Sequence, residues 1–144
     1  MGKHPVISIS LKGINAASYE AAFELTVKTI KGAVEKAGFL KMSDKLDEDE
    51  KKEYRAILDE NMSEATLFWS LKNLSELLEK HYETKVILLI DEYDVPLAKA
   101  FENGYYDKMV FLIRNLLEQT LKTNNSLKFA VMTGCMRIQM NILV

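Results

Sequence analysis

Three carboxylates gather within four positions of the chain, directly after an uncharged stretch. The segment KVILLIDEYDVPL at residues 85–97 runs five aliphatic residues into Asp91, Glu92 and Asp94, and a proline follows at position 96. Like charges held this close repel one another unless a cation lies among them or water screens them. The cluster is therefore a candidate site for a cation. The structural alternative is a buried strand whose acidic end merely caps the next helix.

The aliphatic run at residues 85–91 is typical of a strand that is covered on both faces, as in a parallel sheet. Residues 6–11 alternate Val6/Ser8/Ser10 with three aliphatic residues and predict a second strand, and residues 127–133 predict a third. Long helical segments separate the three strands. We therefore expect parallel strands, right-handed connections and an α/β fold.

Helices are expected where apolar residues recur at spacings of three and four. Ser18 and Ser63 are candidate N-caps, and Gly38 is expected to end the first helix. The charge run at residues 44–53 suits a solvated helix face that continues to about residue 60. Trp69 is expected in the core. The expected helices begin at Ser18, in the charge run, at Ser63 and at about Tyr105, the last one reaching Lys122.

Composition narrows the function classes. The 144 residues fit one domain, and the net charge of −2 with no basic tract does not indicate a nucleic-acid-binding protein. Cys135 is the only cysteine, which rules out an internal disulfide and argues against a cysteine-based zinc site. His4 and His81 have no ligand partners at metal spacing. With no long apolar run and no signal peptide, we expect a cytoplasmic protein without a membrane segment.

The strand ends give the acidic cluster a location. Ligands of open parallel sheets bind just beyond the carboxyl ends of the strands. Asp91 closes one expected strand, and Thr133 and Gly134 close another. We expect these residues to meet at one edge of the sheet.

Two stretches resemble a known family. LLIDEYDVPL is similar to the Walker B region of a family of predicted AAA-type ATPases whose members carry LIDEYD.P, and LKFAVMTGCMRI resembles the next strand of that family, which ends TG.(L/M)RI. The second stretch also looks like the sensor-1 region of signal-transduction NTPases. The opening HPVISISL and the run at 63–85 fit the same family's spacing, so the resemblance covers nearly all of the chain.

The resemblance implies roles for individual residues. Asp91 would hold Mg²⁺, usually through water, and Glu92 would be the catalytic carboxylate that orients the attacking water. Thr133 would be a polar sensor near the γ-phosphate of ATP, and Arg137 would contact phosphate or transmit the nucleotide state. For Arg137 a surface salt bridge to Asp94 or Glu92 is the alternative. Asp94, with Pro96 shortly after it, suits a helix N-cap or a supporting partner.

The phosphate cradle of such an enzyme does not occur in the sequence. There is no G-x-x-x-x-G-K-[S/T], and Gly2-Lys3 lacks both the glycine-rich loop and the following Ser or Thr. In the family the P-loop lies upstream of the matched segment. We therefore expect residues 1–144 to form a single, incomplete P-loop NTPase-type domain without the Walker A segment and the last strand. Such a piece should be inactive or very weak alone.

The family arrangement also predicts the shape of the sheet. It implies a partial three-layer αβα fold with strand 85–91 central and one flank of strand 127–133 bare. An unpaired apolar edge recruits partners. We expect it to be covered by the missing P-loop segment, by a second copy of the chain in a homodimer, by a rearranged terminus such as QMNILV, or by aggregation.

Two other function classes stay open at this point. Asp91 and Asp94 could form an oxygen-ligand pair in a metal-dependent hydrolase, although the other strand ends supply no further acids. The carboxylates could also be simple caps in a non-catalytic module that binds a protein through its exposed edge. Metal-dependent activity that is lost with Asp91→Asn would favour the first, and a stable partner without nucleotide dependence the second.

Overall fold

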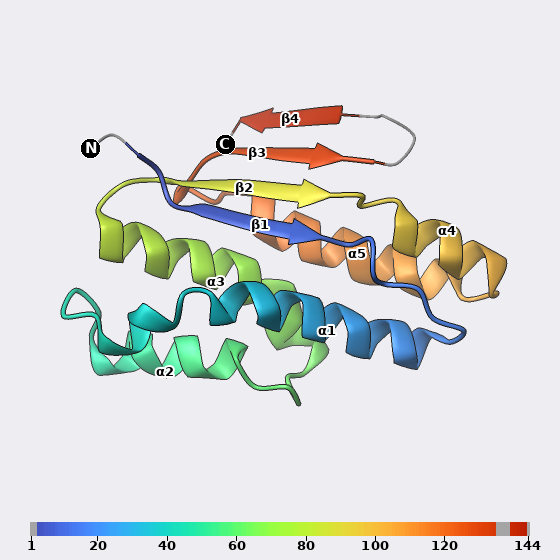
Figure 1. Cartoon of the computed structure of the whole chain (residues 1–144), viewed down its shortest axis with the longest axis horizontal. Helices are drawn as coiled ribbons and strands as arrows, with labels where there is room; N and C mark the ends of the chain where they lie inside the picture. The colour runs from blue at the N-terminus through green and yellow to red at the C-terminus, as the bar shows by residue number, and fades with distance from the viewer. Residues whose placement is uncertain (1–2, 135–138, 144) are drawn as a thin grey trace.

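The computed structural model describes residues 3–134 and the backbone of residues 139–143. Groups of helices separate the first three strands along the chain (Figure 1). In chain order the elements are β1 (Val6–Ser10), α1 (Tyr19–Glu35), the 3₁₀ helix η1 (Gly38–Met42), α2 (Glu48–Ile57), α3 (Glu64–Tyr82), β2 (Val86–Asp91), α4 (Val95–Glu102), α5 (Tyr106–Leu121), β3 (Leu127–Thr133) and β4 (Gln139–Leu143).

The strands form one sheet in the order β1-β2-β3-β4. β1 pairs with β2 and β2 with β3 in parallel, so β2 is the central strand of the three, as expected. β4 pairs antiparallel with β3, with Gln139 opposite Thr133 and Leu143 opposite Phe129. Among the coverings expected for the flank of β3, the rearranged terminus is the one that the structure contains. The prediction of an α/β fold built on a parallel sheet is confirmed.

All the described helices lie on one face of this sheet (Figure 1). α1 packs on β1, α3 packs on β2 and α5, and α4 packs on α5. The strand order explains this arrangement, because both crossovers step in the same direction, and right-handed connections then put their helices on the same side. The helices and the sheet make two layers, which fits an incomplete three-layer αβα fold.

One expectation about β2 was wrong in the part of the chain that the structure describes. The strand is covered on one face only: Val86, Leu88 and Ile90 are buried, whereas the side chain of Leu89 is 37% exposed. On the neighbouring β1, Val6 is 53% exposed. An unbroken aliphatic run lacks the alternation that marks an open face, so the sequence of β2 could not reveal it. We call this side of the sheet the open face.

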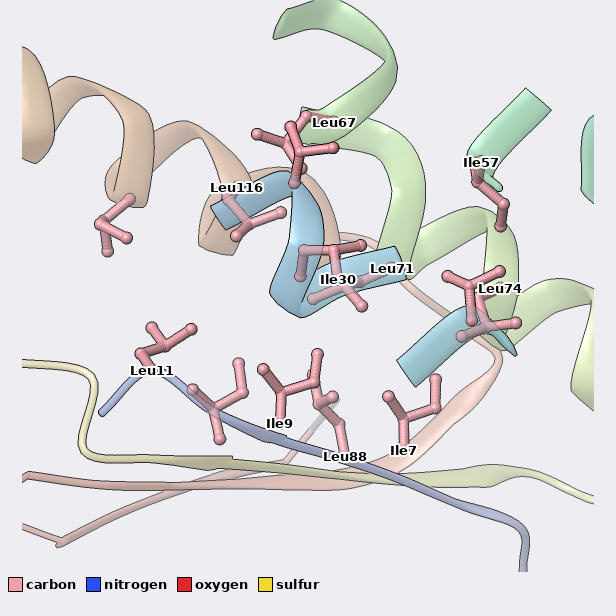
Figure 2. Close-up of a cluster of buried hydrophobic side chains, with 14 of the residues drawn as sticks. Ile7, Ile9, Leu11, Ile30, Ile57, Leu67, Leu71, Leu74, Leu88 and Leu116 are labelled. Atoms are coloured by element: carbon pink, nitrogen blue, oxygen red, sulfur yellow. The ribbon is translucent and has the colours of Figure 1, made fainter. Parts of the chain in front are cut away.

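The core lies between the other face of the sheet and the helices. Ile7, Ile9 and Leu11 of the first strand region point at Ile30 of α1 and at the leucines of α3 (Figure 2). Burying one such side chain contributes about 1.5–3 kcal/mol to folding. The labelled members of this cluster are Ile7, Ile9, Leu11, Ile30, Ile57, Leu67, Leu71, Leu74, Leu88 and Leu116. The packing of these side chains between sheet and helices holds the strands in position from the face opposite the open face.

The helices α1 and α3 begin directly after the serines that were predicted to cap them. Ser18 Oγ accepts a hydrogen bond from the amide of Ala21 at 3.3 Å, and Ser63 Oγ accepts from Thr66 at 3.2 Å, so both predicted N-caps are confirmed. The helix of the charge run begins later than residue 44, because Asp47 and Glu50 form a capping box there. α1 ends at Glu35, and Gly38 opens the 3₁₀ helix instead of closing α1.

Trp69 corrects a second expectation, since its side chain is 42% exposed and not in the core. The buried stripe of α3 contains Leu67, Leu71, Leu74 and Leu78, and Trp69 lies between two of these positions on the helix. The ammonium of Lys72 lies over the indole ring of Trp69, 5.1 Å from its centre, in a cation–π contact.

Candidate functional site

Polar residues line up at the carboxyl ends of the three parallel strands. Asp91 is the last residue of β2 and pairs in register with Ser10, the last residue of β1. On the other side, Ile90 pairs with Met132, which brings Thr133 of β3 beside Asp91. Asp91 and Ser10 are exposed and follow Leu89 and Ser8 by two positions, which places them on the open face. The candidate site therefore opens at the top of the uncovered side of the sheet.

The hydroxyl of Thr133 donates a hydrogen bond to Oδ1 of Asp91. This contact joins the two strand ends that the sequence predicted to meet. A hydrogen bond to an ionised carboxylate is stronger than one between neutral groups. It restrains a short side chain that would otherwise be free on an exposed surface.

The backbone around Asp91 is fixed from both sides. The carbonyl oxygen of Asp91 accepts a hydrogen bond from the amide of Leu11 at 2.9 Å, and the amide of Tyr93 donates to the carbonyl oxygen of Thr133 at 3.1 Å. The end of the central strand is thus bonded to the residue that follows β1. The turn that follows β2 is bonded to the last residue of β3. The strand ends are held as one rigid platform.

Glu92 adopts a left-handed backbone conformation, with φ of 53°. This region costs a residue with a side chain about 1–2 kcal/mol. It also ends the strict alternation of the strand, which would otherwise send Asp91 and Glu92 to opposite faces. This backbone conformation favours glycine, but the residue here is a glutamate. Backbone outliers of this kind concentrate at functional sites.

Asp94 occupies the N-cap position of α4, and Pro96 lies in the first turn, as expected. Its side chain makes no capping hydrogen bond. The carboxylate lies instead against Gly134, where an added β-carbon would come within 3.1 Å of Oδ2. Asp94 therefore packs the start of α4 onto the end of β3, which supports the platform.

The remaining candidates from the sequence are Arg137, Cys135, His4 and His81. Arg137 and Cys135 lie outside the described residues. His81 Nδ1 is 2.6 Å from Ser43 Oγ, and His4 Nδ1 is 2.7 Å from the carbonyl oxygen of Lys85. Both histidines thus join loops to neighbouring elements.

The acidic cluster can serve as half of a metal site. Among residues 3–134, no group of three or more His, Cys, Asp or Glu side chains is arranged to hold a metal ion. Mg²⁺ does not need such a group, because it commonly keeps several waters and takes one or two carboxylates together with substrate phosphates. An exposed aspartate with a hydroxyl beside it fits that kind of site. It does not fit a dedicated protein cage.

A groove of about 1080 Å³ lies elsewhere, between α1 and the residues that lead into α3. Tyr19 is in its wall and donates a hydrogen bond to Glu64 Oε2 at 3.0 Å. Burial, and then this hydrogen bond, raise the pKa of Tyr19 to about 12. The phenol therefore stays protonated at neutral pH and ties α1 to α3. Of the predicted site residues that the structure describes, none lines this groove.

The model of one protein family, described as AAA-ATPase_like, Predicted AAA-ATPase, matches residues 1–144. The chain belongs to this family. The match spans the whole chain, which confirms the AAA-ATPase-like resemblance that the LIDEYD and TGCMRI stretches indicated. Curated proteins and solved structures gave no match. None of the helices in the described part of this AAA-ATPase-like chain has the length and apolar composition that a membrane crossing needs.

Sequence reasoning missed two features of the candidate site in this AAA-ATPase-like chain. Ser10 stands beside Asp91 in the row of strand ends, and the alternation of Val6, Ser8 and Ser10 was the available signal, because it marks an uncovered face. The contact of Asp94 with Gly134 left no signal, since it depends on how α4 docks onto β3.

Proposed function

We propose that this chain carries the metal-binding and water-orienting part of a Mg²⁺-dependent ATPase domain, and that it is inactive or very weak on its own. The family membership supports an ATPase-like domain. The observation that carries the proposal is the position of Asp91: it ends the central parallel strand on the open face and receives the hydroxyl of Thr133. Carboxyl ends of parallel strands are where such sheets bind ligands.

Each residue of the site takes a role that its chemistry suits. Asp91 would hold Mg²⁺, through water or directly, with a carboxylate already oriented by its neighbour. Bound Mg²⁺ would neutralise charge on the phosphates of ATP. Glu92 would accept a hydrogen bond from the attacking water and polarise it. Thr133 ends β3 beside Asp91 and would hold its carboxylate in place. Arg137, which lies outside the described residues, would contact phosphate or transmit the nucleotide state.

The grip on the phosphates would come from a segment outside these residues. A phosphate cradle needs backbone amides at a helix N-terminus together with a lysine, and the sequence contains no such motif. The open face supports a docking place for that segment, because Val6 and Leu89 are exposed there while parallel sheets are normally covered on both faces. A connection that runs opposite to the two present crossovers would put its helix on this face.

A second copy of the chain is the other partner that this proposal admits. The outer edges of β1 and β4 carry backbone groups without a neighbouring strand in the order β1-β2-β3-β4. Such edges pair readily with another strand. A homodimer formed at an edge would leave the open face uncovered, whereas a docked phosphate-binding segment would cover it.

The proposal is tested with the purified chain, ATP and a divalent metal. We expect negligible ATP hydrolysis and no tight ATP binding by calorimetry. Mn²⁺, used as a paramagnetic substitute for Mg²⁺, should broaden the NMR signals of amides around Asp91 selectively. Asp91→Asn should remove that broadening, and Asp44→Asn, at an exposed aspartate far along the chain, should leave it unchanged. Tight Mg²⁺-dependent ATP binding would contradict the proposal. Mn²⁺ broadening that persists in Asp91→Asn would contradict it as well.

The two other function classes receive unequal support. A metal-dependent hydrolase built on Asp91 and Asp94 lacks a third ligand among the described side chains, and no observation favours it. An interaction module is compatible with the open face, where exposed Val6 and Leu89 would suit a protein partner. If Mn²⁺ binding is absent and a partner binds without nucleotide, the interaction module would replace the ATPase proposal.

A further inference from the structure

We propose that Thr133 is a positioning residue for the carboxylate of Asp91, and that its hydroxyl proton is not directed at a phosphate. This inference rests on the proposed metal role of Asp91 and defines how β3 contributes to it. The contact that carries it is the hydrogen bond from Thr133 Oγ1 to Asp91 Oδ1.

A threonine hydroxyl has one proton to donate and two lone pairs that accept. While the hydroxyl donates its hydrogen bond to Asp91, it cannot also donate one to a phosphate oxygen. Its lone pairs still accept, and the donors expected at such a site are waters bound to a metal. The arrangement therefore couples Thr133 to the cation and its waters, in contrast to the γ-phosphate sensor that the family resemblance implied.

The backbone presents this hydroxyl at a fixed place. The carbonyl oxygen of Thr133 accepts from the amide of Tyr93 at 3.1 Å, two residues after Asp91. On the far side, the amide of Leu11 holds the carbonyl oxygen of Asp91 at 2.9 Å. Both ends of the side-chain hydrogen bond are thus anchored by main-chain hydrogen bonds. The remaining freedom is the rotation of the Asp91 carboxylate, which the hydroxyl restrains.

The hydrogen bond occupies one lone pair of Oδ1, so Oδ2 of Asp91 is the more open oxygen for the cation. A ligand that is held in its binding orientation loses less rotational freedom when the metal binds. Partners that orient a metal ligand through a hydrogen bond typically change metal affinity by about 10–100-fold when they are removed. We expect an effect in this range for Thr133.

The test uses Mn²⁺ alone, with its affinity measured from the relaxation of amide signals near Asp91. Thr133→Val keeps the branched shape and removes the hydroxyl, and it should weaken Mn²⁺ binding by about 10-fold or more. Thr133→Ser keeps the hydroxyl and should bind Mn²⁺ with nearly the affinity of the unmodified chain. Ser8→Ala, which removes another hydroxyl from the exposed side of β1, is the matched control and should change nothing.

Hydrogen exchange of the Tyr93 amide checks the fold at the same time, since its acceptor is the backbone of Thr133 and every variant keeps it. Equal Mn²⁺ affinity for Thr133→Val and the unmodified chain would overturn the positioning role. An affinity that follows the free energy of unfolding of the variants, and not the presence of the hydroxyl, would also overturn it. Mn²⁺ binding that survives Asp91→Asn would overturn the metal role of Asp91 itself, which separates the two failures.

Discussion

The carboxylate of Asp94 packs directly onto Gly134. A β-carbon built at Gly134 would lie 3.1 Å from Oδ2 of Asp94 and 3.2 Å from its Cγ, which is closer than ordinary contact. The N-cap position of α4 is thereby joined to the end of β3, one residue beyond Thr133. The absence of a side chain at position 134 is what permits this approach.

The first prediction follows from this contact. Gly134→Ala should destabilise the chain by about 1–3 kcal/mol, because the new methyl group displaces the Asp94 carboxylate. In an Asp94→Ala background the same substitution should cost little. Urea denaturation of the four chains gives the coupling energy. An equal cost in both backgrounds would show that the methyl group meets something other than Asp94.

The second prediction concerns the backbone of Glu92, which has φ of 53°. Glu92→Gly should be more stable than Glu92→Ala by about 1 kcal/mol, because glycine adopts the left-handed region without strain. Thermal unfolding measures the difference. Glu83, with φ of 58° at the end of α3, offers a matched pair of variants away from the site. If glycine gave no advantage over alanine at position 92 but did at 83, the left-handed turn at Glu92 would not persist in solution.

The third prediction separates backbone conformation from space. Neither Gly32 nor Gly104 has an atom within 4 Å of an added β-carbon, but Gly104 has φ of 80° and Gly32 lies within α1. Gly32→Ala should stabilise by about 0.5–1 kcal/mol, since alanine favours a helix over glycine. Gly104→Ala should destabilise by about 1–2 kcal/mol. Chemical denaturation curves with the same slope would give both values, and a same-sign result would contradict the two backbone assignments.

The fourth prediction concerns a buried amide that joins α3, α5 and the residue just before β3. Asn124 Nδ2 donates to Ser75 Oγ at 3.0 Å and to the carbonyl oxygen of Thr120 at 2.7 Å, while Oδ1 accepts from the amide of Ser126 at 3.0 Å. Asn124→Ala should cost about 1–3 kcal/mol, because buried polar partners lose their hydrogen bonds.

Asn115 provides the control for this substitution, since it makes one exposed hydrogen bond to the carbonyl oxygen of Phe111. Asn115→Ala should change stability by less than about 0.5 kcal/mol. Both effects are read from the midpoint of urea unfolding. Similar costs for the two asparagines would mean that the Asn124 network is not desolvated in solution.

The fifth prediction is a pH dependence that originates in Tyr54. Its phenol is buried and donates to the carbonyl oxygen of Val34 at 2.6 Å. Burial, and to a lesser degree the charge of Glu35, raise the pKa of Tyr54 from 10.0 to about 12. The folded state therefore favours the neutral phenol. Its contribution is complete below pH 10, where the unfolded chain is also neutral, and is lost as the pH rises from 10 toward 12.

Unfolding by urea at a series of pH values should show this decline, and Tyr54→Phe should flatten part of it. The variant should be less stable at neutral pH, because the hydrogen bond to Val34 is lost. Some decline should remain, since the pKa of Tyr19 is also raised to about 12. An unchanged slope in Tyr54→Phe would assign the alkaline transition to other groups.

Much of the fold could be predicted from the sequence because its signals are local. Ser18 and Ser63 start helices through hydrogen bonds within one turn, and the β-branched strands are short and bounded. Parallel pairing follows from the long connections. The position of β2 in the centre needed the family resemblance, because register between strands depends on contacts across about 80 residues of chain, such as the amide of Ile87 with the carbonyl oxygen of Pro5.

The open face shows where sequence patterns fail. The aliphatic run of β2 looks the same whether one face or both are covered, and only the direction of the crossovers decides. The candidate site could be predicted because the carboxyl ends of neighbouring parallel strands lie side by side. Asp91 and Thr133 meet there as predicted. The left-handed turn at Glu92 depends on the surrounding structure, and a glutamate gives no sign of it.

The pairing of β4 along β3 has a kinetic consequence. Residues 139–143 use their main chain to occupy the side of β3 that faces away from β2. A strand supplied by another polypeptide would have to displace these five residues before it could pair with that side of β3. Such an assembly would proceed by strand exchange, with a rate limited by how often β4 detaches from β3.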